Sequence, residues 1–295
     1  MSSPGRLSAW WLAARPKTLA AGLVPVGVGT AIAHTHGGIH ISAALACAAG
    51  SVLIQVGTNL ANDYFDHKKG ADTEDRLGPA RAVQQGWISP MAMVTATAIS
   101  LGLALAVGIY LIGLGGLPIA LIGLASLVCA VAYTGGPFPL AYLGLGDVFV
   151  FLFFGLAAVV GTTWVQTLTA PPQAWIAGSA VGLLATAILV VNNLRDRETD
   201  AIANKRTLAV RWGATAARRE HAGLSSGAFL LIWGTGLLGL SPLMWSGLIV
   251  LCIPVAIHEI RAVHAKDGAA LNPHLGGAAR LELLFGLAIC LGCVL

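Results

Sequence analysis

The feature that most constrains this chain is a series of nine apolar stretches, each of which could cross a membrane as a helix. Each has roughly 19–24 residues, and a ~30 Å hydrocarbon layer needs about 20 helical residues. Only 10% of the residues are charged, too few to coat a soluble protein of 295 residues. The strands of a membrane barrel would alternate polar and apolar residues, and these stretches do not. The sequence predicts an all-α polytopic membrane protein with transmembrane helices near residues 18–36, 41–63, 89–112, 116–134, 147–168, 173–195, 222–240, 243–262 and 277–295.

The charged residues gather on one side of this predicted topology. All 17 lysines and arginines fall before the first stretch or around the second, sixth and eighth connections. By the positive-inside rule the N-terminus is cytoplasmic, and nine spans put the C-terminus outside a bacterial-type inner or plasma membrane. Eight of the 13 acidic residues fall in two windows, 63–75 and 196–200. Because acidic residues contribute little to orientation, their clustering predicts a chemical site on the cytoplasmic side.

The chain also repeats itself. Asn59 and Asp63 recur in the second half as Asn192 and Asp196, and each pair closes an even-numbered stretch ahead of a long polar loop. Parallel repeats also occur in transporters, so the repeat alone leaves the function open. We expect a single integral membrane domain over residues 1–295, with pseudo-repeats at about 18–134 and 147–262 and a ninth helix at 277–295.

Each pair extends into an acidic motif. The first is Asn59-x3-Asp63-x2-Asp66, and the second is Asn192-x3-Asp196-x3-Asp200. At about 100° per residue, these steps keep each triplet on one face of a helix. Carboxylates that face one another at a membrane repel unless a cation separates them, and Mg²⁺ prefers oxygen ligands of this kind. The spacing predicts a Mg²⁺ site between two helices, with the ligands Asn59, Asp63, Asp66, Asn192, Asp196 and Asp200.

Two other interpretations of the acidic motifs stay open. The acids could be interfacial charges paired with lysine and arginine, or they could form the site of a cation-coupled transporter. Two copies at matching places in the two halves disfavour simple interfacial pairing. A coupled-transport site predicts charges near the bilayer midplane, whereas these acids lie at the ends of the stretches.

Basic residues follow each motif. Metal-bound carboxylates beside lysine and arginine form a diphosphate clamp, because the metal bridges oxygens and the cations stabilise the leaving group. The candidate diphosphate contacts are Asn59, Asn192, Lys68, Arg81, Lys205 and Arg206. Membrane anchoring accounts for Lys68 equally well. In the short connection near the middle of the chain, Tyr133 and Asp147 are candidates for an acceptor pocket, although a boundary aromatic and a helix N-terminal acid explain them equally well.

Three long stretches around these residues carry a family resemblance. They are NDYFDHKKGADTEDRLGPARAVQQGWIS (62–89), YTGGPFPLAYLGLGDVFVFLFFG (133–155) and NNLRDRETDAIANKRTLAVRWG (192–213), and the opening ARPKTL (14–19) belongs with them. The chain resembles the UbiA-type intramembrane aromatic prenyltransferases over nearly its whole length, and most of all the branch that acts on 1,4-dihydroxy-2-naphthoate in menaquinone biosynthesis. One departure is Asn204, where that branch usually has glycine before the lysine. Asparagine tolerates a left-handed turn, so the departure changes little.

The resemblance implies a prenyl transfer. A polyprenyl diphosphate would bind between the motifs with Mg²⁺, and its tail would lie in an apolar groove open to membrane lipid. Ionisation of the allylic C–O bond would give a carbocation-like centre. The acceptor, 1,4-dihydroxy-2-naphthoate, would attack at its carboxyl-bearing carbon and lose CO₂, giving demethylmenaquinol. The residues implied as catalytic are Asp63, Asp66, Asp72, Asp196 and Asp200.

The resemblance leaves some assignments open. Asp72 would act as a base or as a further metal ligand. Arg15 and Lys17 would meet the carboxylate of the acceptor, unless they only anchor the chain to the membrane. Nothing in the spacing distinguishes naphthoate from another aromatic acceptor such as 4-hydroxybenzoate. No nucleic-acid partner is expected.

Overall fold

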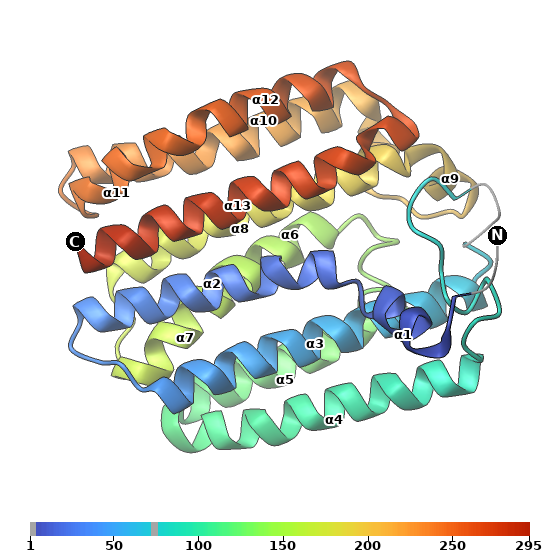
Figure 1. The fold of residues 1–295 in the computed structure, drawn as a ribbon, viewed down its shortest axis with the longest axis horizontal. Helices are drawn as coiled ribbons and strands as arrows, with labels where there is room; N and C mark the ends of the chain where they lie inside the picture. Colours follow the sequence, from blue (N-terminus) through green and yellow to red (C-terminus); the bar gives the residue numbers. More distant parts are fainter. Residues whose placement is uncertain (1–3, 72–75) are drawn as a thin grey trace.

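The protein is a bundle of long helices. The computed structural model describes residues 4–71 and 76–295, and every regular element within those ranges is helical. The long helices run side by side and are joined at the two ends of the bundle (Figure 1). The α-helices are α1 (Arg6–Ala14), α2 (Pro16–Thr35), α3 (Ile41–Lys68), α4 (Pro90–Gly115), α5 (Leu117–Ala132), α6 (Gly146–Val150), α7 (Ala158–Thr167), α8 (Pro172–Arg195), α9 (Arg197–Ile202), α10 (Leu208–Leu237), α11 (Leu243–Leu248), α12 (Ile253–Ala265) and α13 (Asn272–Val294). Three other helical segments are the π-helix η1 (Phe151–Ala157) and the 3-10 helices η2 (Ile249–Cys252) and η3 (Gly268–Leu271).

Seven helical segments of the described chain are long and apolar enough to cross a membrane. They are α2, α3, α4, the run from α6 to α7, α8, the run from α11 to α12, and the run from η3 to α13. The apolar α5 is shorter, and α10 opens with a charged segment. The predicted class, an all-α membrane protein, is confirmed, whereas nine as the number of spans stays a prediction.

Helix α10 begins at Leu208, well before the apolar stretch at 222 where a helix was expected. The hydroxyl of Thr207 accepts a hydrogen bond from the backbone N–H of Val210 and so caps the first turn. Gly213 then bends the chain, with φ 81° and ψ 172°. Hydropathy predicts only the part of a helix that lies in lipid. The polar first turns of α10 lie outside that part, and the capping residue Thr207 fixes where they begin.

Large apolar side chains cover the outside of the bundle. Ile109 on α4, Leu124 on α5 and Leu230 on α10 are each more than 60% exposed. Lipid, rather than water, is the solvent that such a surface requires. By contrast α8 is the most enclosed of the seven segments and packs against α2, α10, α13 and η1. The protein is therefore an integral membrane protein built around α8.

Glycines allow η1 and α8 to approach closely. A Cβ atom on Gly155 would collide with the backbone at Gly178 and Gly182. Small residues are what permit helices in lipid to pack at such short range. The contact holds η1 against α8, whose end carries the second acidic motif. The segment η1 is a π-helix, a type that is frequent at functional sites.

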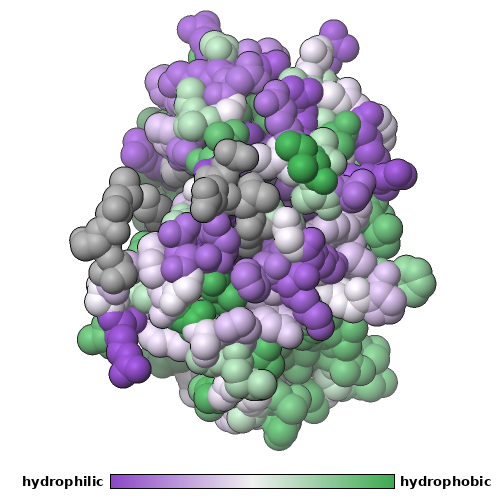
Figure 2. Space-filling view, turned by 90° about the vertical axis from the view of Figure 1, so that its right-hand side faces the viewer, coloured by the Kyte–Doolittle hydropathy of each residue, from purple (hydrophilic) through white to green (hydrophobic). Residues whose placement is uncertain are grey.

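Polar groups gather at one end of the bundle. This end holds α1, α9 and residues 76–89, which lead into α4 (Figure 1). Viewed end-on it is largely hydrophilic, with apolar side chains along its flank (Figure 2). The C-terminal end of α13 lies at the opposite end from α1 (Figure 1). Which end faces the cytoplasm, and the division into pseudo-repeats, stay predictions.

Candidate active site

A cavity of about 1090 Å³ lies inside the bundle, between α1 to α5, the run from α6 to α7, α8 and the start of α13. Its wall is apolar along the helices and polar at the hydrophilic end. The polar part carries four carboxylates and five basic side chains, which are Asp63, Asp66, Asp196, Asp200, Arg15, Arg76, Arg81, Arg195 and Lys205. The polar part suits an anion bound together with cations, and the apolar part suits a hydrocarbon chain.

The first acidic motif lies on one face of α3, as its spacing predicts. The carboxylate oxygens of Asp63 accept hydrogen bonds from the backbone N–H groups of Ala82 and Val83, at 3.0 and 3.1 Å. Asp63 is 2% exposed, so these bonds fold the following loop back over the cavity. Asp63 therefore anchors the loop in addition to facing the cavity.

Asp66 is held between two segments. Its Oδ2 accepts from Nη2 of Arg81 at 2.9 Å, and its Oδ1 accepts from the hydroxyl of Tyr142 at 3.0 Å. Both members of the Arg81 pair are buried. The loop that Asp63 anchors therefore brings Arg81 into the site, as the sequence predicted, whereas the contribution of Tyr142 was not predicted.

Asn59 is oriented by the chain entering α2. Its Nδ2 donates to the carbonyl oxygen of Ala14 at 3.0 Å and to the hydroxyl of Thr18 at 3.1 Å. The junction is a tight turn, with Arg15 in the left-handed region at φ 53°. Because the amide nitrogen is occupied by these acceptors, the Oδ1 of Asn59 is the atom available to a cation.

The second motif is not one continuous helix, and the sequence expectation of a single helical face is wrong here. α8 ends at Arg195, Asp196 is its C-terminal cap with φ −91° and ψ 7°, and Asp200 belongs to the separate α9. Both aspartates nevertheless lie on the cavity wall. At the break the carboxylate of Asp196 accepts hydrogen bonds from the guanidinium of its neighbour, a contact that helix periodicity does not describe.

That neighbour, Arg195, was missed as a site residue. Its Nε and Nη2 donate to the two oxygens of Asp196 at 2.7 and 2.5 Å. The same guanidinium also donates to Oδ1 of Asn192 at 2.9 Å and to Oδ1 of Asn272 on α13 at 3.1 Å. The sequence signal that could have found it is an arginine one helical turn after Asn192, inside an apolar helix end. Arg195 links the second motif to α13.

Asp200 pairs with Lys205 across the turn after α9. Their closest atoms, Oδ1 and Nζ, are 3.6 Å apart, and Oδ2 of Asp200 is buried with no hydrogen-bond partner among the described residues. Burial raises the pKa of Asp200 to about 6, and the ammonium of Lys205 opposes that rise. Burial by itself would lower the pKa of Lys205, but the carboxylates led by Asp200 outweigh it and raise the pKa. Between them Asn204 adopts the left-handed turn expected for it, at φ 55°.

The remaining predicted residues divide into four groups. Arg15, Tyr133 and Asn192 lie on the cavity wall. Asp147 lies beside it, in a space of about 10 Å³ that it shares with Tyr133. Among the described residues the cavity wall does not include Lys68 and Arg206, which are exposed, and their roles stay predictions. Asp72 and the side chain of Lys17 lie outside the described part of the chain.

The sequence profile of the UbiA prenyltransferase family matches residues 22–280. The chain belongs to the UbiA prenyltransferase family. Within it, the chain is 36% identical over 300 residues to the 1,4-dihydroxy-2-naphthoate octaprenyltransferase of Haemophilus influenzae, covering 98% of this chain and 97% of that protein. It is 37% identical to the protein of the same name from Escherichia coli, covering 98% and 96%. A human relative, UbiA prenyltransferase domain-containing protein 1, is 28% identical and covers 98% of this chain and 84% of the human protein.

Solved structures of UbiA proteins share the fold. A UbiA homolog from Archaeoglobus fulgidus bound to GPP and Mg²⁺ superposes with a TM-score of 0.70 at 16% identity, covering 96% of this chain and 99% of that one. A UbiA homolog from Aeropyrum pernix superposes with a TM-score of 0.69 at 17% identity, covering 93% and 96%. The UbiA arrangement of helices predicted from the sequence is thereby confirmed.

The polar end of this UbiA-family cavity fits a divalent cation. The buried Oδ2 of Asp200 lacks a partner among the described residues, and the amide of Asn59 presents its oxygen. Hard oxygen donors of this kind are the ligands that Mg²⁺ prefers. Arginine or backbone N–H groups hold the other three carboxylates, so a cation entering the site would compete with Arg81 and Arg195.

Proposed function

We propose that this protein transfers a polyprenyl group from polyprenyl diphosphate to 1,4-dihydroxy-2-naphthoate, with Mg²⁺ as cofactor. CO₂ and diphosphate are lost, and the product is demethylmenaquinol, an intermediate of menaquinone biosynthesis. Two kinds of observation support the proposal. Relatives named 1,4-dihydroxy-2-naphthoate octaprenyltransferase are 36–37% identical to this chain over nearly its full length. The cavity is charged at one end and apolar along the rest. The cavity is the single structural observation that carries it.

The charged end would hold the diphosphate and the metal. When bound, Mg²⁺ supplies positive charge to the oxygens of the diphosphate. The ligands would be Asn59, Asp63, Asp66, Asn192, Asp196 and Asp200, contacting it directly or through water. Arg81 and Lys205 would stabilise the negative charge that builds on the departing diphosphate. Asp66 holds Arg81 and Asp200 holds Lys205 at the charged end of the cavity. We retain Lys68 and Arg206 as outer contacts of the diphosphate.

The apolar part of the cavity would hold the prenyl chain. Its wall includes Phe149, Phe153 and Phe154 from the run between α6 and η1, together with Leu111 and Leu127 from α4 and α5. A wall of this kind is as apolar as the lipid around the protein, so a prenyl chain can pass from the membrane into the cavity without exposure to water. Water is also displaced from the carbon that reacts.

The acceptor would lie between these two regions. Arg15 lies on the cavity wall at the start of α2, where its charge can meet the carboxylate of the naphthoate, with Lys17 as a second basic group. Tyr133 faces the same cavity and offers a ring to stack on the acceptor. Asp147 would contact a hydroxyl of the acceptor, and Asp72 would serve as base or further metal ligand. The site would face the cytoplasm.

The test is a membrane assay with labelled polyprenyl diphosphate, Mg²⁺ and two acceptors in parallel. We expect 1,4-dihydroxy-2-naphthoate to yield a prenylated, decarboxylated product and 4-hydroxybenzoate to yield none. Prenylation of the benzoate alone would keep the reaction class and overturn the acceptor. Failure of both acceptors with folded protein would overturn the proposed reaction.

A further inference from the structure

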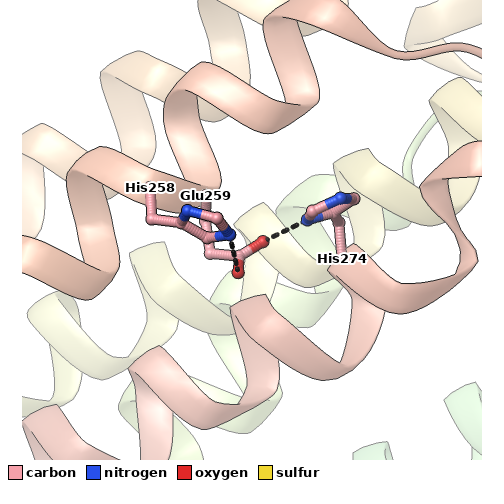
Figure 3. Close-up of side chains that lie close together, drawn as sticks. All are labelled: His258, Glu259 and His274. Atoms are coloured by element: carbon pink, nitrogen blue, oxygen red, sulfur yellow. Dashed lines mark hydrogen bonds and ion pairs between the residues drawn. The ribbon is translucent and has the colours of Figure 1, made fainter.

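A second cluster of ligand-type side chains lies between α12 and α13. His258 and Glu259 come from α12, about two turns before that helix ends, and His274 comes from the first turn of α13 (Figure 3). Among the described residues, none of the three lines the large cavity. The cluster is therefore separate from the acidic motifs.

The three side chains converge on one point. Nδ1 of His274 lies 2.8 Å from Oε2 of Glu259, and Nε2 of His258 lies 3.9 Å from Oε1 of the same carboxylate (Figure 3). One ligand atom from each residue lies within 4.8 Å of the others. Glu259 and His274 are buried by the packing of the two helices, while His258 is exposed. Two ligands are thus fixed, and the third can move in from the surface.

A glycine makes the convergence possible. A Cβ atom on Gly277 would overlap the carboxylate of Glu259. Gly277 follows His274 by three residues, so both lie on the face of α13 that meets α12. The carboxylate reaches across the interface only because this position has no side chain.

A lysine occupies the far side of His274. Nζ of Lys266 lies 2.7 Å from Nε2 of His274. Since an ammonium group only donates, Nε2 accepts, and the ring proton sits on Nδ1 and is donated to Glu259. A hydrogen-bond chain that joins α12 to α13 accounts for Lys266, His274 and Glu259. It does not account for His258, which stands beside the same carboxylate.

We propose that His258, Glu259 and His274 bind a transition-metal ion of the Zn²⁺ type. Two imidazoles and one carboxylate with an open position are a characteristic zinc donor set, and they differ from the oxygen donors that suit Mg²⁺. Metal–ligand bonds of about 2.0–2.2 Å require donor atoms about 3–3.5 Å apart. The donors now lie within 4.8 Å of one another, so the exposed His258 has to move inward by roughly 1 Å. To bind the metal through Nδ1, the neutral ring of His274 takes its other tautomer, with its single proton on Nε2. Because that N–H only donates, the ammonium of the exposed Lys266 swings away from it.

The ion would brace part of the wall of the main cavity, which includes Asn272. Asn272, two residues before His274, donates to the carbonyl oxygen of Leu77 and accepts from Arg195. A metal that clamps α12 to this turn of α13 holds Asn272 in place. The site therefore contributes to the stability of the region that carries the second motif.

The experiment is a titration of the full chain, purified without a polyhistidine tag, stripped with chelator and held in lipid nanodiscs. Co²⁺ is the probe, because its visible absorption reports nitrogen ligation, and Zn²⁺ is the competitor. We expect one equivalent of absorbing Co²⁺ that Zn²⁺ displaces and millimolar Mg²⁺ does not. His258→Ala and Glu259→Gln should each weaken binding at least about tenfold. Lys266→Gln should tighten it, because the competing ammonium is removed.

Two controls separate the outcomes. His264→Ala removes an exposed histidine of the same helix, whose ring bonds the carbonyl oxygen of Ile260 in its own helix, and should leave the titration unchanged. Asp196→Ala should keep the Co²⁺ absorption, which separates this site from the acidic motifs. No absorption at millimolar Co²⁺, or equal affinity in wild type and the surface variant His258→Ala, would show that the cluster is only a hydrogen-bond chain. Weaker binding in Lys266→Gln would overturn the proposal as well.

Discussion

Replacing Arg195 by glutamine removes the cation from a buried ion pair and leaves Asp196 behind. The two side chains are 2% and 10% exposed, and three of the four hydrogen bonds made by this guanidinium go to the second motif. Removal of one partner of a buried pair costs about 3–5 kcal/mol, because the remaining charge stays uncompensated. Glutamine can still donate one hydrogen bond, so we expect a loss of about 3 kcal/mol.

The loss can be measured as a shift in thermal unfolding. At about 2.1 cal/mol/K of unfolding entropy per residue, a loss of about 3 kcal/mol in a chain of 295 residues corresponds to a fall in Tm of roughly 5 °C. The eight tryptophans supply an intrinsic fluorescence signal for the purified protein in nanodiscs. The double variant Arg195→Gln/Asp196→Asn removes both charges and should recover at least about 1 kcal/mol of the loss. It should stay inactive in prenyl transfer, because the carboxylate is gone.

Arg197 provides the matched control. It is the next arginine in the chain, half-exposed, and it pairs at 3.3 Å with Glu198, whose side chain is 82% exposed. Arg197→Gln should change stability by less than about 0.5 kcal/mol, because exposed pairs contribute little. If Arg195→Gln unfolds within a degree of Arg197→Gln, or if the double variant is less stable than the single one, the pair does not hold the second motif as we argue.

Other predictions concern the same cavity. EDTA should stop prenyl transfer and Mg²⁺ should restore it, whereas turnover unaffected by chelation would rule out the metal-dependent mechanism. Because the pKa of Asp200 is raised to about 6, a proton competes with the cation below that pH. At limiting Mg²⁺ activity should therefore fall as the pH drops through 6, and saturating Mg²⁺ should restore it; an unchanged Mg²⁺ requirement between pH 5.5 and 7.5 would contradict this. Asp63→Asn should free the loop at Ala82 and Val83 at a cost of about 1–3 kcal/mol. Limited proteolysis would show this as faster cleavage after Arg81, and equal cleavage of variant and wild type would argue against the anchor.

The sequence predicted the acidic motifs and the basic residues beside them, but not how they pair. Spacing along α3 placed Asp63 and Asp66 on one face, and the structure agrees. Spacing could not show that α8 ends at Arg195, or that its guanidinium there donates to Asn272 of a distant helix. Charge and spacing predicted all four basic residues, Lys68, Arg81, Lys205 and Arg206, as diphosphate contacts. Of these four, Arg81 and Lys205 line the cavity and the other two do not.

The sequence by itself determined the membrane class, the chemistry of the polar residues and their location at helix ends. Those properties depend on hydropathy and spacing over a few turns, which are local. Tertiary structure alone decided the anchoring of Asp63 to the loop, the link from Arg195 to α13, and the meeting of His258, Glu259 and His274. Each of these joins segments that are separate in the chain, and their approach depends on how whole helices pack, including at glycines such as Gly155 and Gly277. No local pattern carries that information, because the same residues would have other neighbours in another packing.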